Sequence, residues 1–568
     1  MNSKLWLMLL SLALVFVLAA CGGEDEPADG DGGGDDEETA DDTEEADGDD
    51  SEESEDEAAG EAAADQTLIF ARGGDSVSLD YASVTDGESS RVTKQIYETL
   101  IEFDEDSFEI GPGLAEDWDV SDDGLTFTFQ LREGVTFHDG TDFNAEAVKI
   151  NFERWADPDH EYNFADEGYA YSVYGQQFGG FKGDDGHVID EINVLGDHEV
   201  EFVLSEQLGS FIQNMGMSYF AMTSPAAFEE YGSEINENPV GTGPFQFVSW
   251  SRDDSIVLEK YEDYWQEGLP KLDQVIFQVI PDNAARLTAL RSGEIDIMDG
   301  LNPDDVEMIE SEPELTVFER ATNNIGYLGF NMDKEPFDDP LVRRAFNHAI
   351  DKEALITSLY AGLAEPAKNL IPPGYMGYND SIEEYAYDPD EAQALLDEAG
   401  HADGLEFDLW TMPVARPYMP DPERAAEVIQ ANFAEIGVTA NIVSMEWATY
   451  LERTEQGEQD VFMLGWSGVN GDPDYFFSNL LHGSAIPGGN RTFYRSDEVD
   501  DLFDSAKVSV EEEERIALYE EAQEVIHEDA PLVPLVHTTP VLAGSDRVQG
   551  YVPHPSTSET LLEVELTE

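Results

Sequence analysis

The chain has 568 residues, and its 126 acidic side chains outnumber the 27 basic ones, giving a formal net charge of −99. So negative a surface repels nucleic acid and anionic membrane faces, which excludes both as expected partners. Because only concentrated salt screens repulsion of this size, the composition is typical of a halophilic protein.

The first 20 residues predict an export signal. Lys4 precedes an apolar run from Leu5 to Leu18, which has the length of a signal-peptide core and is short for a membrane span. Two alanines then lead to Cys21, the only cysteine of the chain. These residues resemble a bacterial lipobox, so we expect cleavage before Cys21, its lipidation, and anchoring at the extracellular face of the cell membrane. The alternative is a plain secretory signal followed by an incidental cysteine.

Residues 21–65 predict an acidic tether. Positions 22–65 hold 23 acidic residues and no Lys or Arg. With so little apolar surface to bury, like charges should keep the segment extended and disordered. A calcium-binding array is the alternative interpretation, but the segment lacks the spaced Asp residues, turn Gly and closing Glu of a calcium loop.

The body from residue 66 onward is too long for one ordinary core and predicts two or more lobes. Alternating apolar residues over 125–131 indicate a half-buried strand, and residues 135–137 predict a short return strand. Asn144 should cap a helix whose buried face carries Phe152. A strand over 275–280, a helix over 284–290 and a short strand at 295–297 predict a β-α-β unit.

The second half of the body alternates helices with strands. Helices are predicted to start at Asp339-Pro340 and Asp388-Pro389, where an aspartate precedes a proline of the first turn, and at Pro422. Strands are predicted over 405–409, 438–443 and 461–464. This rhythm predicts an α/β layer architecture. Ligands of such sheets bind beyond the carboxyl ends of the strands, where Trp410–Tyr418 and Trp466–Asp474 lie.

Several ordered motifs in the body resemble those of the family 5 extracellular solute-binding proteins, which serve dipeptide, oligopeptide, nickel and glutathione importers. The motifs run through nearly the whole mature chain: Leu114 to Trp118, Asp122 to Phe127, Leu131 to Gly140, Gly241 to Phe245, Gly329 to Asn331, Phe337 to Ala345 and Gly465 to Gly468.

The resemblance implies an α/β fold of the two-lobed periplasmic-binding-protein type, in its large form with an extra subdomain and a two-crossover hinge. We place the crossovers near Arg320 and Thr538. The first lobe would then hold residues 66–320 plus 539–568, including the extra subdomain, and the second lobe residues 321–538. The implied protein is a monomer that delivers ligand to the permease and ATPase subunits of an ABC transporter.

The likeness is nearest to the dipeptide-binding branch. The stretch Met412 to Tyr418 corresponds to one of its pocket loops, in which the arginine matching Arg416 holds the carboxylate of a peptide. A guanidinium suits this task because it forms a bidentate, charge-assisted pair. Met412 and Tyr418 are expected beside the ligand. The alternative for Arg416 is a surface ion pair with one of the many acidic residues.

The second pocket loop begins with Trp466, Ser467 and Gly468, which we also expect at the ligand. The branch has a carboxylate for the peptide amine three residues after the tryptophan, and here that position is Val469. An ammonium buried without a counter-charge is costly. Asp472 is a candidate substitute, although it also fits the shaping of a turn. An N-blocked peptide, a longer peptide or another carboxylate-bearing ligand is therefore favoured over a strict dipeptide.

The loop after the first strand, with Gly74 and Ser76, resembles the pocket loop of the first lobe. The nickel branch takes a metal chelate, and His482 follows the second pocket loop. A nickel chelate or another carboxylate-bearing small molecule is thus the alternative ligand, unless His482 is a plain surface residue. We expect no enzyme activity, cofactor or resident metal, since the sequence has no Gly-x-Ser-x-Gly elbow and no His-Glu-x-x-His motif.

Overall fold

The computed structural model describes residues 66–84 and 86–567, within a compact unit that spans Ala63–Glu568. The predicted signal peptide, Cys21 and the tether lie outside the described residues. Within the described part of the chain, no helix is both long and apolar enough to cross a membrane.

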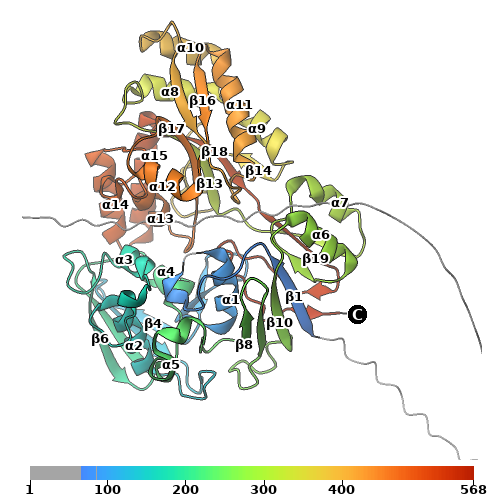
Figure 1. Ribbon diagram of the computed structural model, residues 1–568. Helices are drawn as coiled ribbons and strands as arrows, with labels where there is room; N and C mark the ends of the chain where they lie inside the picture. Colours follow the sequence, from blue (N-terminus) through green and yellow to red (C-terminus); the bar gives the residue numbers. More distant parts are fainter. Residues whose placement is uncertain (1–65, 85, 568) are drawn as a thin grey trace, which may run out of the picture. The chain divides into compact units, whose positions relative to one another are not determined.

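A seven-stranded sheet forms the centre of the first lobe (Figure 1). Its strands, in spatial order, are β12 (Leu315–Glu319), β19 (Val541–Ser545), β11 (Ile297–Met298), β1 (Thr67–Arg72), β10 (Gln274–Val279), β9 (Ser255–Lys260) and β8 (Phe245–Ser251). The central strand β1 pairs in parallel with β10 and β11, and the outer pairs are antiparallel. Strand β19 therefore returns to this sheet from near the C-terminus.

The predicted β-α-β unit is confirmed as β10, α6 (Asn283–Ser292) and β11. Its two strands, β10 and β11, flank β1 on either side. The Asp282 carboxylate accepts from the Ala285 amide (2.8 Å) and caps the start of α6. Gly293 ends the helix with φ at +73°, a conformation that costs glycine little.

A second, four-stranded antiparallel sheet belongs to the subdomain of the first lobe. Its order is β4 (Ala115–Val120), β5 (Thr126–Leu131), β7 (Glu199–Leu204) and β6 (Ile189–Gly196). The strand predicted over 125–131 is confirmed as β5, whose apolar residues are buried. The helix predicted after Asn144 is confirmed as α2 (Ala145–Ala156), and Phe152 lies in the subdomain core.

The return strand predicted at 135–137 is wrong. Only an isolated bridge between Thr136 and Asp142 forms there. Gly134 and Gly140 both have positive φ angles, +80° and +78°, so the chain turns on either side of this segment before a strand can extend. Val135 and Phe137 are still buried, which is why their spacing resembled a strand.

The second lobe contains a six-stranded mixed sheet. Its order is β14 (Ala364–Pro366), β18 (Leu532–Thr538), β13 (Asn324–Phe330), β17 (Val461–Ser467), β15 (Glu406–Trp410) and β16 (Thr439–Val443). Strand β15 runs parallel to both β16 and β17, whereas the pairs formed by β13, β14 and β18 are antiparallel. The predicted α/β architecture is therefore confirmed.

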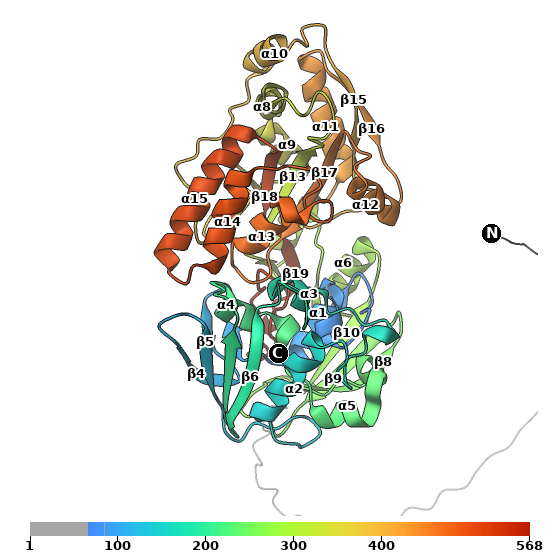
Figure 2. The same cartoon turned by 90° about the vertical axis from the view of Figure 1, so that its left-hand side faces the viewer.

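The helices predicted in this lobe begin where the sequence places their caps. They are α8 (Pro340–Ala349), α10 (Pro389–Glu398) and α11 (Pro422–Glu435), each preceded by an aspartate whose carboxylate accepts from a backbone amide of the first turn. Figure 2 shows the long helices α14 (Asp497–Val508) and α15 (Glu512–Asp529) packed along each other. The remaining helices of the lobe are α9 (Lys352–Leu359), α12 (Trp447–Glu455) and α13 (Asp474–Leu480).

Shorter elements complete the first lobe. The helices are α1 (Gly87–Ile96), α3 (Ser172–Gln177), α4 (Phe211–Met215), α5 (Pro225–Tyr231) and α7 (Val306–Glu310). Two small hairpins pair β2 (Ile101–Phe103) with β3 (Ile110–Pro112) and β20 (Val548–Gln549) with β21 (Glu565–Leu566).

The chain passes between the two large sheets twice, from β12 to β13 and from β18 to β19. The two connecting segments lie side by side, because the Arg320 amide donates to the Pro540 carbonyl oxygen (2.9 Å). The side-chain oxygen of Asn324 accepts from the amide and the hydroxyl of Thr538, both at 3.0 Å. The predicted lobe boundaries at residues 320 and 538 stay a prediction, since the body packs as one unit.

A buried ion-pair network ties the first of these segments to the first lobe. Glu559, which is 1 % exposed, accepts from Arg320 Nη2 (3.1 and 3.2 Å) and from Arg91 Nε (3.4 Å). Arg91, in α1, also pairs with Glu88 (3.2 Å) and Asp299 (3.1 Å). Among the described residues, Glu559 is the only ion-pair partner of Arg320.

Candidate ligand-binding site

The two predicted pocket loops of the second lobe leave the same edge of the sheet. Strands β15 and β17 are parallel neighbours, with Leu409 opposite Val461 and Trp410 opposite Phe462. Their carboxyl ends therefore deliver residues 411–420 and 468–474 to one place, as the sequence predicts for a ligand site. Strand β16 is parallel to β15 and ends at the same edge.

The loop that carries Arg416 is held by backbone hydrogen bonds. Arg416 and Met419 exchange two of them, at 3.0 and 2.9 Å, which closes a tight turn around Pro417. The Pro417 carbonyl oxygen accepts from the Thr538 hydroxyl (3.0 Å), and the Tyr418 carbonyl oxygen accepts from the Tyr360 hydroxyl (3.2 Å). The base of the Arg416 side chain is thus fixed to the crossover and to the core of the second lobe.

The guanidinium of Arg416 is half-buried and stacks on an aromatic ring. Its Cζ lies 4.5 Å from the centre of the Trp447 ring. Within the described part of the chain it forms no ion pair and no side-chain hydrogen bond. The alternative of a surface ion pair therefore has no partner there, although acidic residues are abundant. A cation that is partly desolvated and lacks an oxygen acceptor is suited to an external anion.

Met412 and Tyr418 belong to the loop that carries Arg416, and their side chains lie together on its buried side. Met412 is fully buried, and its Sδ accepts from the Tyr418 hydroxyl (3.9 Å). Tyr418 is 9 % exposed, and burial raises its pKa to about 12, so its hydroxyl keeps its proton at neutral pH. A side chain at Gly465 would overlap the Tyr418 ring. In this structure both residues support the loop, and their contact with a ligand stays a prediction.

The second predicted pocket stretch starts within β17, whose last two residues are the half-buried Trp466 and the exposed Ser467, and the buried Gly468 begins the loop itself. The ring of Trp466 lies 5.7 Å from that of Tyr475, and its buried Nε1 has no acceptor among the described residues. Gly468 exchanges hydrogen bonds with Asn323, through its amide (2.9 Å) and its carbonyl oxygen (2.7 Å). A side chain at Gly468 would overlap the Tyr375 hydroxyl, so this position requires glycine.

Val469 and Asp472, the two residues of this loop considered for the peptide amine, both have partners within the protein. Val469 packs against the hydrophobic cluster of the first-lobe subdomain. Both oxygens of Asp472 lie within 2.9 Å of Arg515 Nη2, and Asp472 is 3 % exposed. Next to Val469, the side-chain amide of Asn470 donates to the side-chain oxygen of Asn214 (3.0 Å), so the loop contacts both lobes. Asp472 is thus occupied by Arg515, which fits its alternative role of shaping the turn.

The first-lobe loop is built around Arg72. Its Nη1 donates to the Ser76 hydroxyl (2.8 Å), which donates onward to the Glu88 carbonyl oxygen (3.2 Å). Ser76 is 4 % exposed, whereas Gly74 is half-buried and Val77 is 70 % exposed. No hydrogen bond or ion pair between described residues joins this loop to the loops of the second lobe. The roles of Gly74 and Ser76 stay predictions.

His482 is engaged within its own loop. Its Nδ1 accepts from the Ser484 amide (3.0 Å), and its Nε2 lies 3.3 Å from an Asp504 oxygen. The described residues include no group of three or more His, Cys, Asp or Glu side chains that could hold a metal ion. No contact of His482 favours the nickel-chelate alternative.

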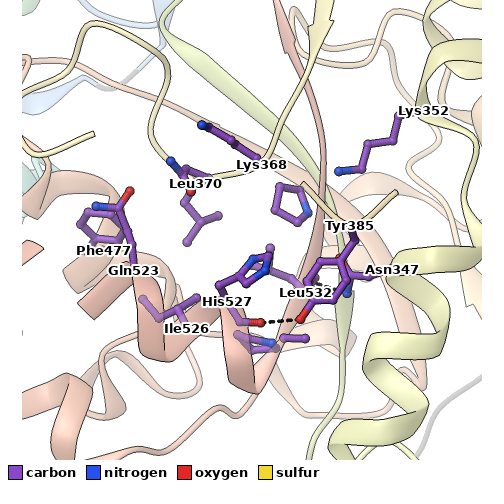
Figure 3. Close-up of a pocket in the computed structure, with 14 residues that line it drawn as sticks. Asn347, Lys352, Lys368, Leu370, Tyr385, Phe477, Gln523, Ile526, His527 and Leu532 are labelled. Atoms are coloured by element: carbon purple, nitrogen blue, oxygen red, sulfur yellow. Dashed lines mark hydrogen bonds between the residues drawn. The ribbon is translucent and has the colours of Figure 1, made fainter. Parts of the chain in front are cut away.

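None of the predicted ligand residues lines either of two cavities found among the described residues. One cavity, of about 30 Å³, lies in the second lobe beside Lys352 and Lys368 and has room for only one or two waters. Figure 3 shows Tyr385 and His527 in its wall, where the Tyr385 hydroxyl donates to the His527 carbonyl oxygen (2.7 Å). The other, of about 210 Å³, lies in the first lobe beside Glu98.

The sequence did not point to Trp447, the residue that contacts the Arg416 guanidinium. Trp447 is the first residue of α12 and follows the carboxyl end of β16. The rule that ligands bind beyond such ends could have indicated it, once β16 was placed parallel to β15. The sequence pattern alone gives no sign that the two side chains stack.

The fold is that of an extracellular solute-binding protein. The chain belongs to the bacterial extracellular solute-binding proteins, family 5, since the model of the middle region of that family matches residues 109–488. The predicted two-lobed fold of this family is confirmed.

Its relatives include several binding proteins. The chain is 36 % identical over 512 residues to heme-binding protein A of Haemophilus influenzae, covering 87 % of this chain and 91 % of that one. It is 36 % identical over 504 residues to the dipeptide-binding protein of Escherichia coli, covering 86 % and 92 %. The solved periplasmic binding protein DppA of Helicobacter pylori, in complex with the peptide STSA, is 38 % identical with a TM-score of 0.76, covering 88 % and 98 %.

Proposed function

We propose that this protein is the substrate-binding component of an ABC importer and captures a peptide-like ligand by its carboxylate. The observation that carries the proposal is the Arg416 guanidinium. It lies at the carboxyl edge of the second-lobe sheet, stacked at 4.5 Å on Trp447 and without an oxygen acceptor among the described residues. An incoming carboxylate would supply that acceptor through a bidentate pair.

The relatives support a peptide as the ligand. The Escherichia coli relative is a dipeptide-binding protein by name, and the Helicobacter pylori relative was solved with a peptide. These relatives are binding proteins, which supports a binding role without catalysis. The relative that is named for heme binding shows that family membership alone does not fix the ligand.

The amine end of the ligand is proposed to differ from that of a free dipeptide. Val469 stands where the dipeptide-binding branch has an acidic residue, and it packs against an apolar cluster. An ammonium at this place would lack a counter-charge and would have to be desolvated. We therefore propose an N-blocked peptide or a longer peptide whose amine lies elsewhere.

Delivery is proposed to follow the scheme of the family. Cys21 would carry the lipid anchor, and the acidic tether would let the body move above the extracellular face of the membrane. Closure of the lobes on the ligand would favour the form that docks on the permease, because the ligand has more contacts in the closed state. The acidic surface is proposed to suit concentrated salt.

Titration calorimetry tests the ligand class. The probes are the peptide STSA, its N-acetyl form and its C-terminal amide, added to the full chain without its signal peptide in concentrated salt. We expect the two free acids to bind and the N-acetyl acid to bind at least as well as STSA. Binding of the amide with undiminished affinity, or of none of the three peptides, would reject the proposal. Mass spectrometry of ligand that copurifies with the protein identifies the natural cargo.

A further inference from the structure

Most cations that lie over aromatic rings in the described part of the chain also pair with a carboxylate. Nine other cations of the described residues lie over a ring, and each also reaches a carboxylate. Arg495, for example, lies 5.9 Å from the Phe493 ring centre and 2.7 Å from Asp333. Among the ten cations that lie over a ring in the described part of the chain, only Arg416 does not also reach a carboxylate oxygen.

The ring under Arg416 is itself fixed. Trp447 stacks on Tyr450, with ring centres 5.7 Å apart and an angle of 12° between the planes. Tyr450 is fully buried, and its hydroxyl donates to the Met463 carbonyl oxygen (2.7 Å) in β17. Contacts between side chains therefore run from Tyr450 in the core of the second lobe, through Trp447, to the Arg416 guanidinium; we call these three side chains the column.

The backbone turn and this column hold Arg416 from two directions. The turn fixes the start of the side chain through Met419 and Thr538, and the Trp447 face fixes its planar end. A guanidinium that is already oriented loses less freedom when it binds a carboxylate, so its affinity is higher. Half-buried surroundings also strengthen the pair relative to one in water.

We infer that Trp447 is a positioning residue for the ligand carboxylate and acts through Arg416. This inference rests on the proposed function, because it assigns a second residue to the same site. The indole face satisfies one side of the guanidinium and leaves the N–H groups for the carboxylate. Trp447 thereby contributes to selection of free-acid ligands over amides of the same peptide.

Calorimetry with N-acetyl-STSA and its C-terminal amide tests the inference. Trp447→Leu removes the π face and keeps apolar bulk, and Trp447→Phe keeps a weaker π face. We expect Trp447→Leu to weaken binding of the acid by about 2- to 30-fold, the range of a cation–π contact, with a smaller loss for Trp447→Phe. Binding of the amide should stay unchanged in both variants. Phe493→Leu, which removes a ring from beneath an already paired arginine, is the control and should change neither affinity.

The Arg416→Gln background separates the two proposals. There, adding Trp447→Leu should cause no further loss of acid binding, because the side chain through which Trp447 acts is gone. Equal losses for acid and amide, equal losses for the Leu and Phe variants, or a loss that persists without Arg416 would overturn the positioning role alone. Unchanged acid binding by Arg416→Gln itself would overturn the proposed function.

If Trp447→Leu does not fold, tryptophan analogues with one, two or three ring fluorines, inserted at position 447 by codon suppression, replace it. Each fluorine weakens the π face with little change in packing. Affinity for the acid should then fall stepwise while affinity for the amide stays constant. A flat series for the acid would reject the inference.

Discussion

Replacement of Glu559 by glutamine removes the only ion-pair partner that Arg320 has among the described residues. Glu559 is 1 % exposed and also accepts from the Tyr551 hydroxyl (2.9 Å), a bond that the glutamine amide can keep. The loss is therefore mainly electrostatic. Leaving a buried arginine without its carboxylate typically costs about 3–5 kcal/mol.

The pKa of Glu559 gives a second estimate of how much this carboxylate contributes to the free energy of unfolding. Burial alone would raise it, but Arg320 and Arg91 outweigh burial and lower the pKa from 4.5 to about 2. A carboxyl whose folded pKa is depressed by this much contributes about 3 kcal/mol of stability above pH 4.5. That contribution is lost as the pH falls through about 2. The two estimates of the free energy that Glu559 contributes therefore agree, and the second also gives the pH range over which the contribution disappears.

Scanning calorimetry at constant salt measures the effect. For a body of about 500 residues, a change of about 3 kcal/mol shifts Tm by roughly 3 °C if the body unfolds as one unit. We expect Glu559→Gln to lower Tm by this amount at pH 7, and the difference from the unmodified protein to shrink below pH 4. Glu563→Gln is the control, since its 3.2 Å pair with Lys271 is half exposed and should contribute little. Equal Tm values for the two variants, or a difference that does not change with pH, would refute the reasoning.

Three other changes have definite expected outcomes. Burial, assisted by Glu102, raises the pKa of Glu98 from 4.5 to about 7, so the folded protein keeps this carboxyl neutral up to about pH 7 whereas the unfolded chain ionises it above about pH 4.5. The stability that is present below pH 4.5 is therefore lost as the pH rises through 7. Glu98→Gln should therefore raise Tm relative to the unmodified protein at pH 8 and not at pH 4, and an equal Tm at pH 8 would contradict this. Val469→Asp should improve binding of STSA relative to N-acetyl-STSA by about 10-fold or more in calorimetry, because an ammonium then has a counter-charge. An unchanged ratio would count against the assignment of the amine position. Raising NaCl from 0.1 to 2 M should raise Tm through screening of the acidic surface, and a constant Tm would contradict the halophilic interpretation.

The fold was largely predictable because its signals are local. Asn144 and the aspartates before α8 and α10 cap the helices that their positions predicted, and α11 starts at the proline that predicted it. Strand β5 shows the alternation of buried and exposed residues that its sequence has. The strand prediction for residues 135–137 was wrong because two buried residues between two turn glycines have the spacing of a strand, whereas the segment is too short to form one.

The site was predictable only in part, since its geometry depends on residues far apart in the sequence. The resemblance selected Arg416, and the parallel order of β15 and β17 explains why both pocket loops meet at one edge. The stack on Trp447 requires knowledge of how α12 lies against the loop, which no local pattern contains. The pairing of Asp472 with Arg515 in α15 is equally remote in sequence, so its role in the turn became clear only from the fold.

Calorimetric comparison of Arg416→Gln with Arg424→Gln tests the central claim most directly. Neither arginine has an ion-pair partner among the described residues, but Arg424 is exposed on α11 whereas Arg416 is half-buried beneath the proposed ligand. With N-acetyl-STSA as the probe, Arg416→Gln should weaken binding by about 10- to 100-fold, the worth of a charged hydrogen-bonded pair, and Arg424→Gln should leave it unchanged. Equal affinities of the two variants would contradict the claim that Arg416 binds the carboxylate.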